Sequence, residues 1–94
     1  MSHDPTARMI LARASELVTG DRADDYGDAA ESFQRVADLW SPILGVTIQP
    51  YQVALCMAQL KISRLLNSPT HGDSWVDAAG YIGLGGQVVP DDVA

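Results

Sequence analysis

Four acidic residues form two pairs whose spacing could place their carboxylates together. Asp28 and Glu31 are three residues apart, and Asp73 and Asp77 are four residues apart. On a helix, residues at these separations project from roughly the same side. Carboxylate oxygens suit Mg²⁺ or Mn²⁺, which also bridge to phosphate groups. The two pairs therefore indicate a candidate metal site, provided that two helices bring them to one groove.

Two basic residues could add affinity for a phosphorylated ligand. Lys61 and Arg64 stand three residues apart in an apolar segment and could supply positive charge to phosphate oxygens. The sequence holds no phosphate-binding glycine loop, no HExxH zinc motif and no nucleophile elbow. Cys56 has no CxxC partner and His71 stands alone, so neither indicates a catalytic thiol or a zinc site.

Each candidate also has an ordinary structural explanation. Asp28 and Glu31 have the spacing of a capping box at a helix start, and Glu31 could also pair with Arg35. Asp73 could cap another helix, with Asp77 as a solvated acid in its first turn. Capping and metal binding are compatible, so both explanations remain open at this point.

Composition and charge bound the class of protein. The chain has 94 residues, of which 47% are hydrophobic and 19% charged, so we expect one globular domain, residues 1–94. A net charge of −6 argues against direct binding of nucleic acid. One cysteine allows no internal disulfide, which suits a reducing compartment. We see no signal peptide and no membrane-spanning run, and we therefore expect a protein of the cytoplasm.

The hydrophobic pattern predicts an all-α fold, a small four-helix bundle. Asp4-Pro5 and Pro50 suit helix starts. Ser41-Pro42 and Gly85-Gly86 are expected to end helices. The predicted helices are about 5–19, 28–41, 50–67 and 73–84, and an acidic tail, 87–94, follows them.

The third predicted helix indicates oligomerisation. Its apolar residues cover most of its circumference, and three short helices would not cover them all. A chain of this length also buries only a modest core and is often completed by other copies. The expected interface residues are Leu65, Leu66, Trp75 and Ile82.

The order of four short motifs resembles a family of small uncharacterised phage and prophage proteins. These motifs are "DYGDAAESF", "VADLW", "VALCMAQLKISRL" and "HGDSWVDAAGY", and together they cover about residues 24–84. The corresponding family pattern is Tyr-Gly, then Leu-Trp, then Leu-Lys-Ile-x-Arg, then Asp-Ser-x-x-Asp-x-x-Gly-Tyr. The resemblance implies a phage protein that acts in the host bacterial cell, but it carries no activity of its own.

A more distant similarity is to the MazG-like all-α nucleotide pyrophosphohydrolases, which hold Mg²⁺ on Glu-x-x-Glu and Glu-x-x-Asp motifs. By this resemblance, "DAAE" and "DSWVD" would stand for the two metal motifs. The departures are an Asp for the first Glu, a spacing of four in the second pair, and an additional helix between the pairs. The implied ligand residues are Asp28, Glu31, Asp73 and Asp77 for the metal, Lys61 and Arg64 for phosphates, and Tyr26 and Trp40 for a base.

Three functions are therefore weighed. The favoured hypothesis is a non-catalytic binding module for a nucleotide or a host protein. The alternatives are a Mg²⁺-dependent nucleoside triphosphate pyrophosphohydrolase and a structural or assembly protein of the virion. All three include a homo-oligomer, a dimer or higher, and none includes a membrane.

Overall fold

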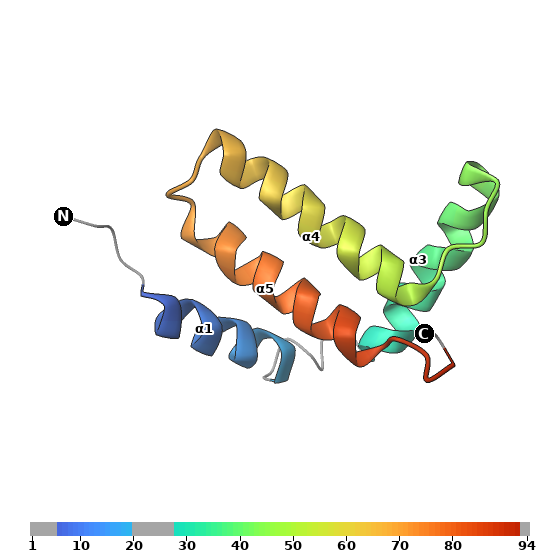
Figure 1. The fold of residues 1–94 in the computed structure, drawn as a ribbon, viewed down its shortest axis with the longest axis horizontal. Coiled ribbons are helices and arrows are strands. Elements are labelled where there is room, and N and C mark those ends of the chain that lie inside the picture. Colours follow the sequence, from blue (N-terminus) through green and yellow to red (C-terminus); the bar gives the residue numbers. More distant parts are fainter. Residues whose placement is uncertain (1–5, 20–27, 93–94) are drawn as a thin grey trace.

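The computed structural model of the chain describes residues 6–19 and 28–92. Within these residues it contains four α-helices and no strand, which confirms the predicted all-α class. The predicted helix start at Pro5 lies outside the described residues. The helices are α1 (Ala7–Thr19), α3 (Ala29–Leu44), α4 (Pro50–Asn67) and α5 (Gly72–Gln87) (Figure 1).

The centre of the fold is an antiparallel hairpin of α4 and α5. Small residues bring the two helices close together at one end of the hairpin. Ala54 is fully buried, and a Cβ added at Gly85 would lie 3.0 Å from the Ala54 Cβ and 3.7 Å from the Tyr51 carbonyl oxygen. The absent side chain at Gly85 therefore sets the distance between the helices.

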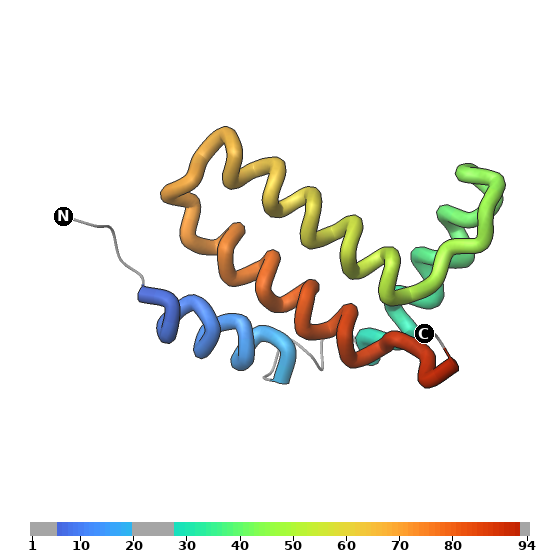
Figure 2. Tube along the Cα trace, viewed as in Figure 1, coloured from blue at the N-terminus to red at the C-terminus, as the bar shows by residue number. Residues whose placement is uncertain are grey.

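The other two helices attach to this hairpin separately. Figure 2 shows α1 beside α5, where Leu17 and Val18 lie 3.6 Å from the position of a Cβ at Gly80. The first half of α3 packs on the start of α4, and Phe33 and Ala37 are buried there. The hairpin is thus covered by α1 along α5 and by α3 at one end of α4.

Helix α3 continues three residues beyond the predicted end at Ser41. Pro42 lies inside its last turn, where it removes one backbone donor. The Ser41 hydroxyl donates to the Ala37 carbonyl oxygen (2.7 Å), and Gly45 N–H donates to the Ser41 carbonyl oxygen (2.9 Å). Gly45 then ends the helix with a φ of 72°, a conformation that glycine adopts without strain.

Helix α5 also runs past its predicted end, through Gly85 and Gly86 to Gln87. These glycines do not stop the helix, because Gly85 serves the contact with α4 instead. Val88 N–H donates to the carbonyl oxygens of Leu84 and Gly85, both at 3.2 Å, and closes the helix. The first residue of the predicted acidic tail, Gln87, is therefore the last residue of α5. Asp91 and Asp92 follow the helix and are exposed.

Many large apolar side chains remain on the surface of this open arrangement. Across the described helices, none combines the length and the apolar character that crossing a membrane requires. The exposed side chains lie mainly on α4 and around the end of α3, with fewer on α1 and α5.

Candidate functional site

The first acidic pair begins a helix. Asp28 has extended backbone geometry (φ −69°, ψ 128°), and its Oδ1 accepts a hydrogen bond of 2.8 Å from Ala30 N–H. The predicted capping role of Asp28 is therefore confirmed. Glu31 follows in the first turn of α3, where a negative charge favours the positive end of the helix.

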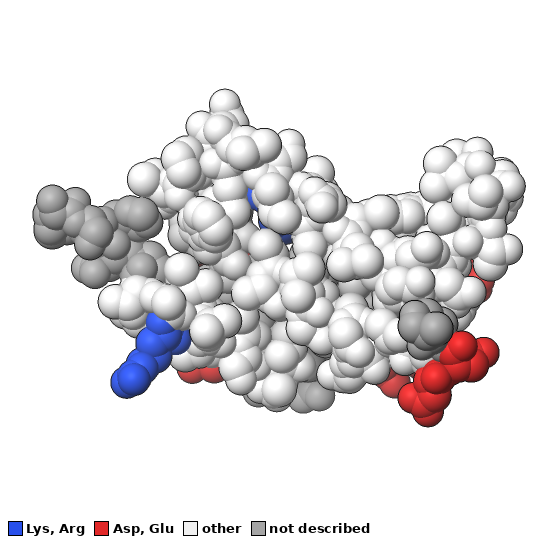
Figure 3. Space-filling view, viewed as in Figure 1, with Lys and Arg blue, Asp and Glu red and all other residues white. Residues whose placement is uncertain are grey.

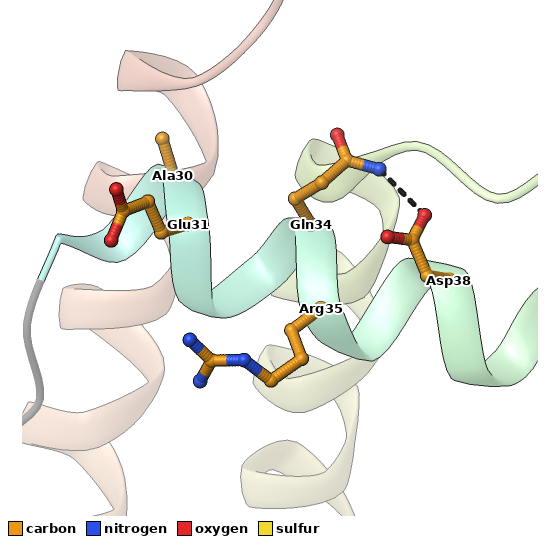
Figure 4. A pocket seen from close by; sticks show the side chains of 5 residues that line it. All are labelled: Ala30, Glu31, Gln34, Arg35 and Asp38. Carbon is orange, nitrogen blue, oxygen red and sulfur yellow. Dashed lines mark hydrogen bonds between the residues drawn. The ribbon is translucent and has the colours of Figure 1, made fainter.

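Glu31 lines an open depression along one side of α3. Its other lining residues are Ala30, Gln34, Arg35 and Asp38, all from the same helix (Figure 4). Gln34 Nε2 donates to Asp38 Oδ1 at 2.9 Å, and Figure 4 shows the Arg35 guanidinium directed away from that pair. Exposed side chains of a single helix cannot enclose a ligand, so this depression does not form a binding pocket.

The second acidic pair is divided between two environments. Asp73 is exposed in the first turn of α5, and the N-cap of that helix is His71 rather than Asp73. Asp77 faces α4, where its Oδ2 lies 3.2 Å from Lys61 Nζ. Asp77, predicted as a metal ligand, and Lys61, predicted as a phosphate contact, therefore neutralise each other between the two helices.

The four acids do not form one metal centre within the described chain. Over residues 6–19 and 28–92, no group of three or more His, Cys, Asp or Glu side chains could hold a metal ion. One carboxylate of each pair already has a structural role, since Asp28 caps α3 and Asp77 pairs with Lys61. The residues in this arrangement therefore do not fit the Mg²⁺ that the MazG resemblance implies, and one site built from both pairs stays a prediction that this geometry does not support.

The remaining predicted ligand residues are also dispersed. Arg64 is exposed in the last turn of α4, where a positive charge favours the helix end, whereas Lys61 is turned toward α5. Trp40 is half-buried against the core around Phe33. Tyr26 lies outside the described residues. The structure thus brings no basic or aromatic pair together around a phosphate or a base among these residues.

Three of the four predicted interface residues are exposed. Leu66 exposes 85% of its surface, Trp75 43% and Ile82 52%. Leu65 is instead buried inside the chain at 7%, so it belongs to the core and not to a surface. The Trp75 indole Nε1–H donates to the Pro69 carbonyl oxygen at 2.9 Å, which fixes the ring against the turn between α4 and α5.

The prediction missed three further exposed apolar residues of α4, of which Leu60 lies apart from Leu55 and Ile62. Leu55 precedes Ile62 by seven residues and Ile62 precedes Leu66 by four, a spacing that keeps Leu55, Ile62 and Leu66 on one side of the helix. This spacing can be seen in the sequence, but apolar residues cover most of the circumference of α4, so the sequence does not show which of them are exposed. We define the hairpin face as Leu55, Ile62, Leu66, Trp75 and Ile82.

A second exposed apolar group, also missed, lies at the end of α3 and just after it. Its members expose between 59% and 80% of their surface. They follow Ala37, the last buried residue of α3, so nothing in the described chain covers them. We define the α3 tip as Leu39, Ile43, Leu44 and Val46.

Comparison with known proteins gives a family but no activity. A protein of Mycobacterium phage L5, named Gene 55 protein, is 46% identical over 76 residues, covering 80% of this chain and 49% of the relative. The Gene 55 protein of Mycobacterium phage D29 is 39% identical over 74 residues, covering 79% of this chain and 49% of the relative. The chain therefore spans about half the length of these relatives. No solved structure matches it.

These relatives confirm the resemblance to uncharacterised phage proteins. The sequence profile of a domain of unknown function matches residues 9–89, which is most of the chain and includes all four described helices except the first two residues of α1. This chain belongs to that family, the domain of unknown function DUF6378.

Proposed function

We propose that the chain is a phage-encoded, non-catalytic module that binds a protein of the host bacterial cell and acts as a homo-oligomer. The observation that carries this proposal is the α3 tip. Four large apolar side chains close together in sequence, each more than half exposed, form a surface of the kind that marks protein contacts.

The position of the α3 tip supports contact with another protein. In Figure 1 the second half of α3 and the connection that follows it extend away from α5. Leu39 and Ile43 are four residues apart and therefore share one side of the helix. A projecting helix end with an apolar side can enter a groove on a partner, as amphipathic helices do in other complexes.

The charge of the chain indicates the chemistry of that partner. The net charge is −6, and the exposed residues of α3 include Glu31 and Asp38. A partner whose apolar groove is bordered by Lys and Arg would attract this surface, whereas an acidic partner would be repelled. The proposed ligand is therefore a host protein with a basic rim around an apolar groove.

Binding accounts for the surface better than catalysis does. The pyrophosphohydrolase alternative requires several carboxylates around one metal, and Asp28 and Asp77 are committed to a cap and an ion pair. Calorimetric titration with Mg²⁺ and a non-hydrolysable nucleoside triphosphate analogue should give no binding heat. Metal-dependent nucleotide binding that disappears in Asp77→Asn would contradict the non-catalytic assignment.

Photo-cross-linking in host cells tests the proposed partner site. A photoreactive residue in place of Ile43 should give a discrete adduct with a host protein, and the same residue in place of Leu11, exposed on α1, should not. The dissociation constant of that purified protein should rise at least about tenfold in Ile43→Asp, as expected for a central apolar contact. Leu11→Asp, the same kind of change at an exposed position on α1, is the matched control. Equal affinity in both variants, with helical content retained, would exclude the α3 tip as the binding site.

A further inference from the structure

The hairpin face is one continuous side of α4 and α5. Successive residues turn a helix by about 100°. On α4, the side that meets α5 is marked by Ala54 and Lys61; on α5, the side that meets α4 is marked by Gly85 and Asp77. On each helix, the exposed apolar side is reached from the contact side by a rotation of about 110° about the helix axis. The rotation has the sense in which the helix turns as the residue number increases. Because the two helices run in opposite directions, equal rotations bring both sets to the same face of the hairpin.

That face is turned away from α3. Val53 of α4 is buried in the core that includes Phe33 of α3, and it lies on the opposite side of α4 from the hairpin face. Figure 3 views the molecule from the side of the hairpin away from α3. Most of the area over α4 and α5 in this view is free of Lys, Arg, Asp and Glu.

Charge permits a second copy to approach this face in spite of the net charge of −6. Helix α4 contains no Asp or Glu, although the chain holds twelve acidic residues. Of the two acids in α5, Asp77 is paired with Lys61, and Asp73 lies on the other side of the helix from Ile82. Two copies that meet through the hairpin face therefore bring no unpaired acid against another.

The spacing of the hairpin face is self-complementary. We define the α4 midpoint as the point halfway between Leu55 and Leu66, which falls between Leu60 and Lys61. We define the α5 midpoint as the point halfway between Trp75 and Ile82, which falls between Ala78 and Ala79. In an antiparallel pair of identical helices, a residue before such a midpoint meets the residue equally far after it.

The register of the hairpin places these two midpoints side by side. Ala54, which contacts Gly85, lies as far before the α4 midpoint as Gly85 lies after the α5 midpoint. The ion pair of Lys61 and Asp77 agrees with this register to within one residue. A single two-fold axis through both midpoints therefore relates Leu55 to Leu66 and Trp75 to Ile82 between two copies.

We infer that a second copy of this chain covers the hairpin face, with α4 against α4 and α5 against α5 in antiparallel pairs about this axis. The inference rests on the oligomeric part of the proposed function and is independent of the α3 tip. The contact forms a four-helix bundle from two hairpins, the arrangement that buries such apolar sides. Gln59 lies next to the axis, where its amide can bond to that of the second copy and fix the register.

The available surface is sufficient for a stable contact. The five side chains of the hairpin face are 40% to 85% exposed. Their exposed parts amount to roughly 500 Å² on one copy, and two copies together approach the roughly 1,000 Å² that a specific interface needs. Trp75 supplies a large anchor whose indole is already held by Pro69, so little freedom is lost on association.

Mixed cysteine cross-linking tests the axis. In a Cys56→Ser background, one preparation carries Leu55→Cys and a second, with a different tag, carries Leu66→Cys. After the two are mixed and mildly oxidised, a disulfide should join one copy of each. Neither preparation alone should cross-link, because identical positions lie about 16 Å apart along the antiparallel helices, beyond the reach of a disulfide.

The outcomes separate the inference from the proposed function. A link in the mixture alone supports the axis. A link within the Leu55→Cys preparation alone would overturn it, since that requires a different register. A dimer mass in solution without the mixed link would overturn the axis and leave the oligomeric proposal intact. A monomer mass at all concentrations would overturn both.

Discussion

The hairpin face and the α3 tip both expose large apolar side chains, but they differ in what supports them. The hairpin face is carried by two helices that contact each other over their length, with the close approach of Ala54 and Gly85 at one end. The α3 tip follows the last buried residue of its helix, Ala37, and is held by the cap at Gly45 and by a hydrogen bond from Ile48 N–H to the Ser41 hydroxyl. A rigid and regularly spaced surface suits an identical partner, whereas a projecting end suits a groove of different shape.

The hairpin face and the α3 tip also differ in the acidic residues near them, and this difference leads to the same two partners. Helix α4 has no acid, whereas Asp38 directly precedes the α3 tip. Self-association through the tip would bring like charges together. The difference explains why we assign a second copy to one region and a basic partner to the other.

Disruption of the hairpin should have the largest effect on stability. Gly85→Val places a branched side chain where even a Cβ lies 3.0 Å from the Ala54 Cβ. Urea denaturation should show a loss of about 1–3 kcal/mol in the free energy of unfolding, because the helices must separate. The dimer should weaken as well, since the hairpin face depends on the helix spacing.

Gly86→Ala is the matched control for this change. A Cβ at Gly86 meets nothing within 4 Å. Stability should be retained or rise by up to about 1 kcal/mol, because alanine restricts the unfolded chain. An equal loss of stability in both variants would show that the close approach at Gly85 does not hold the hairpin together.

A smaller effect, confined to α3, is expected from Asp28→Ala. Loss of the cap on Ala30 N–H should cost about 1 kcal/mol. Amide hydrogen exchange should become about fivefold faster along α3, while α4, α5 and the dimer mass stay unchanged. Glu31→Ala should accelerate exchange along α3 less, because the capping hydrogen bond is made by Asp28. Equal acceleration in α5 would show that the two regions do not open separately.

Most of the fold was predictable, because the apolar periodicity and the residues at the helix starts indicated the same helices. Apolar periodicity gave four helices, and Asp28 and Pro50 marked two starts correctly. The two misplaced ends have different causes. Helix α3 passes Pro42 because the cap at Gly45, three residues further on, closes it by a local hydrogen bond to the Ser41 carbonyl oxygen. Helix α5 passes Gly85 because that glycine serves a contact with α4, which the neighbouring sequence does not reveal.

The candidate site was less predictable, because carboxylates at helical spacing serve caps and ion pairs as well as metals. The sequence showed that Asp77 and Lys61 could each act on a phosphorylated ligand, but not that α4 and α5 would place them 3.2 Å apart. The burial of Leu65 beside the exposed Leu66 likewise depends on how α4 is rotated in the fold.

The most direct test of the account is the mass in solution of the purified chain and of Leu66→Asp, measured by light scattering over a range of concentrations. We predict a dimer for the unmodified chain and a monomer with unchanged helical content for Leu66→Asp, because a charge at this exposed position harms only the contact between copies. Leu11→Asp, on the exposed side of α1, should remain a dimer and serves as the control. A monomeric unmodified chain, or a dimer that persists in Leu66→Asp, would contradict the assignment of the hairpin face to a second copy.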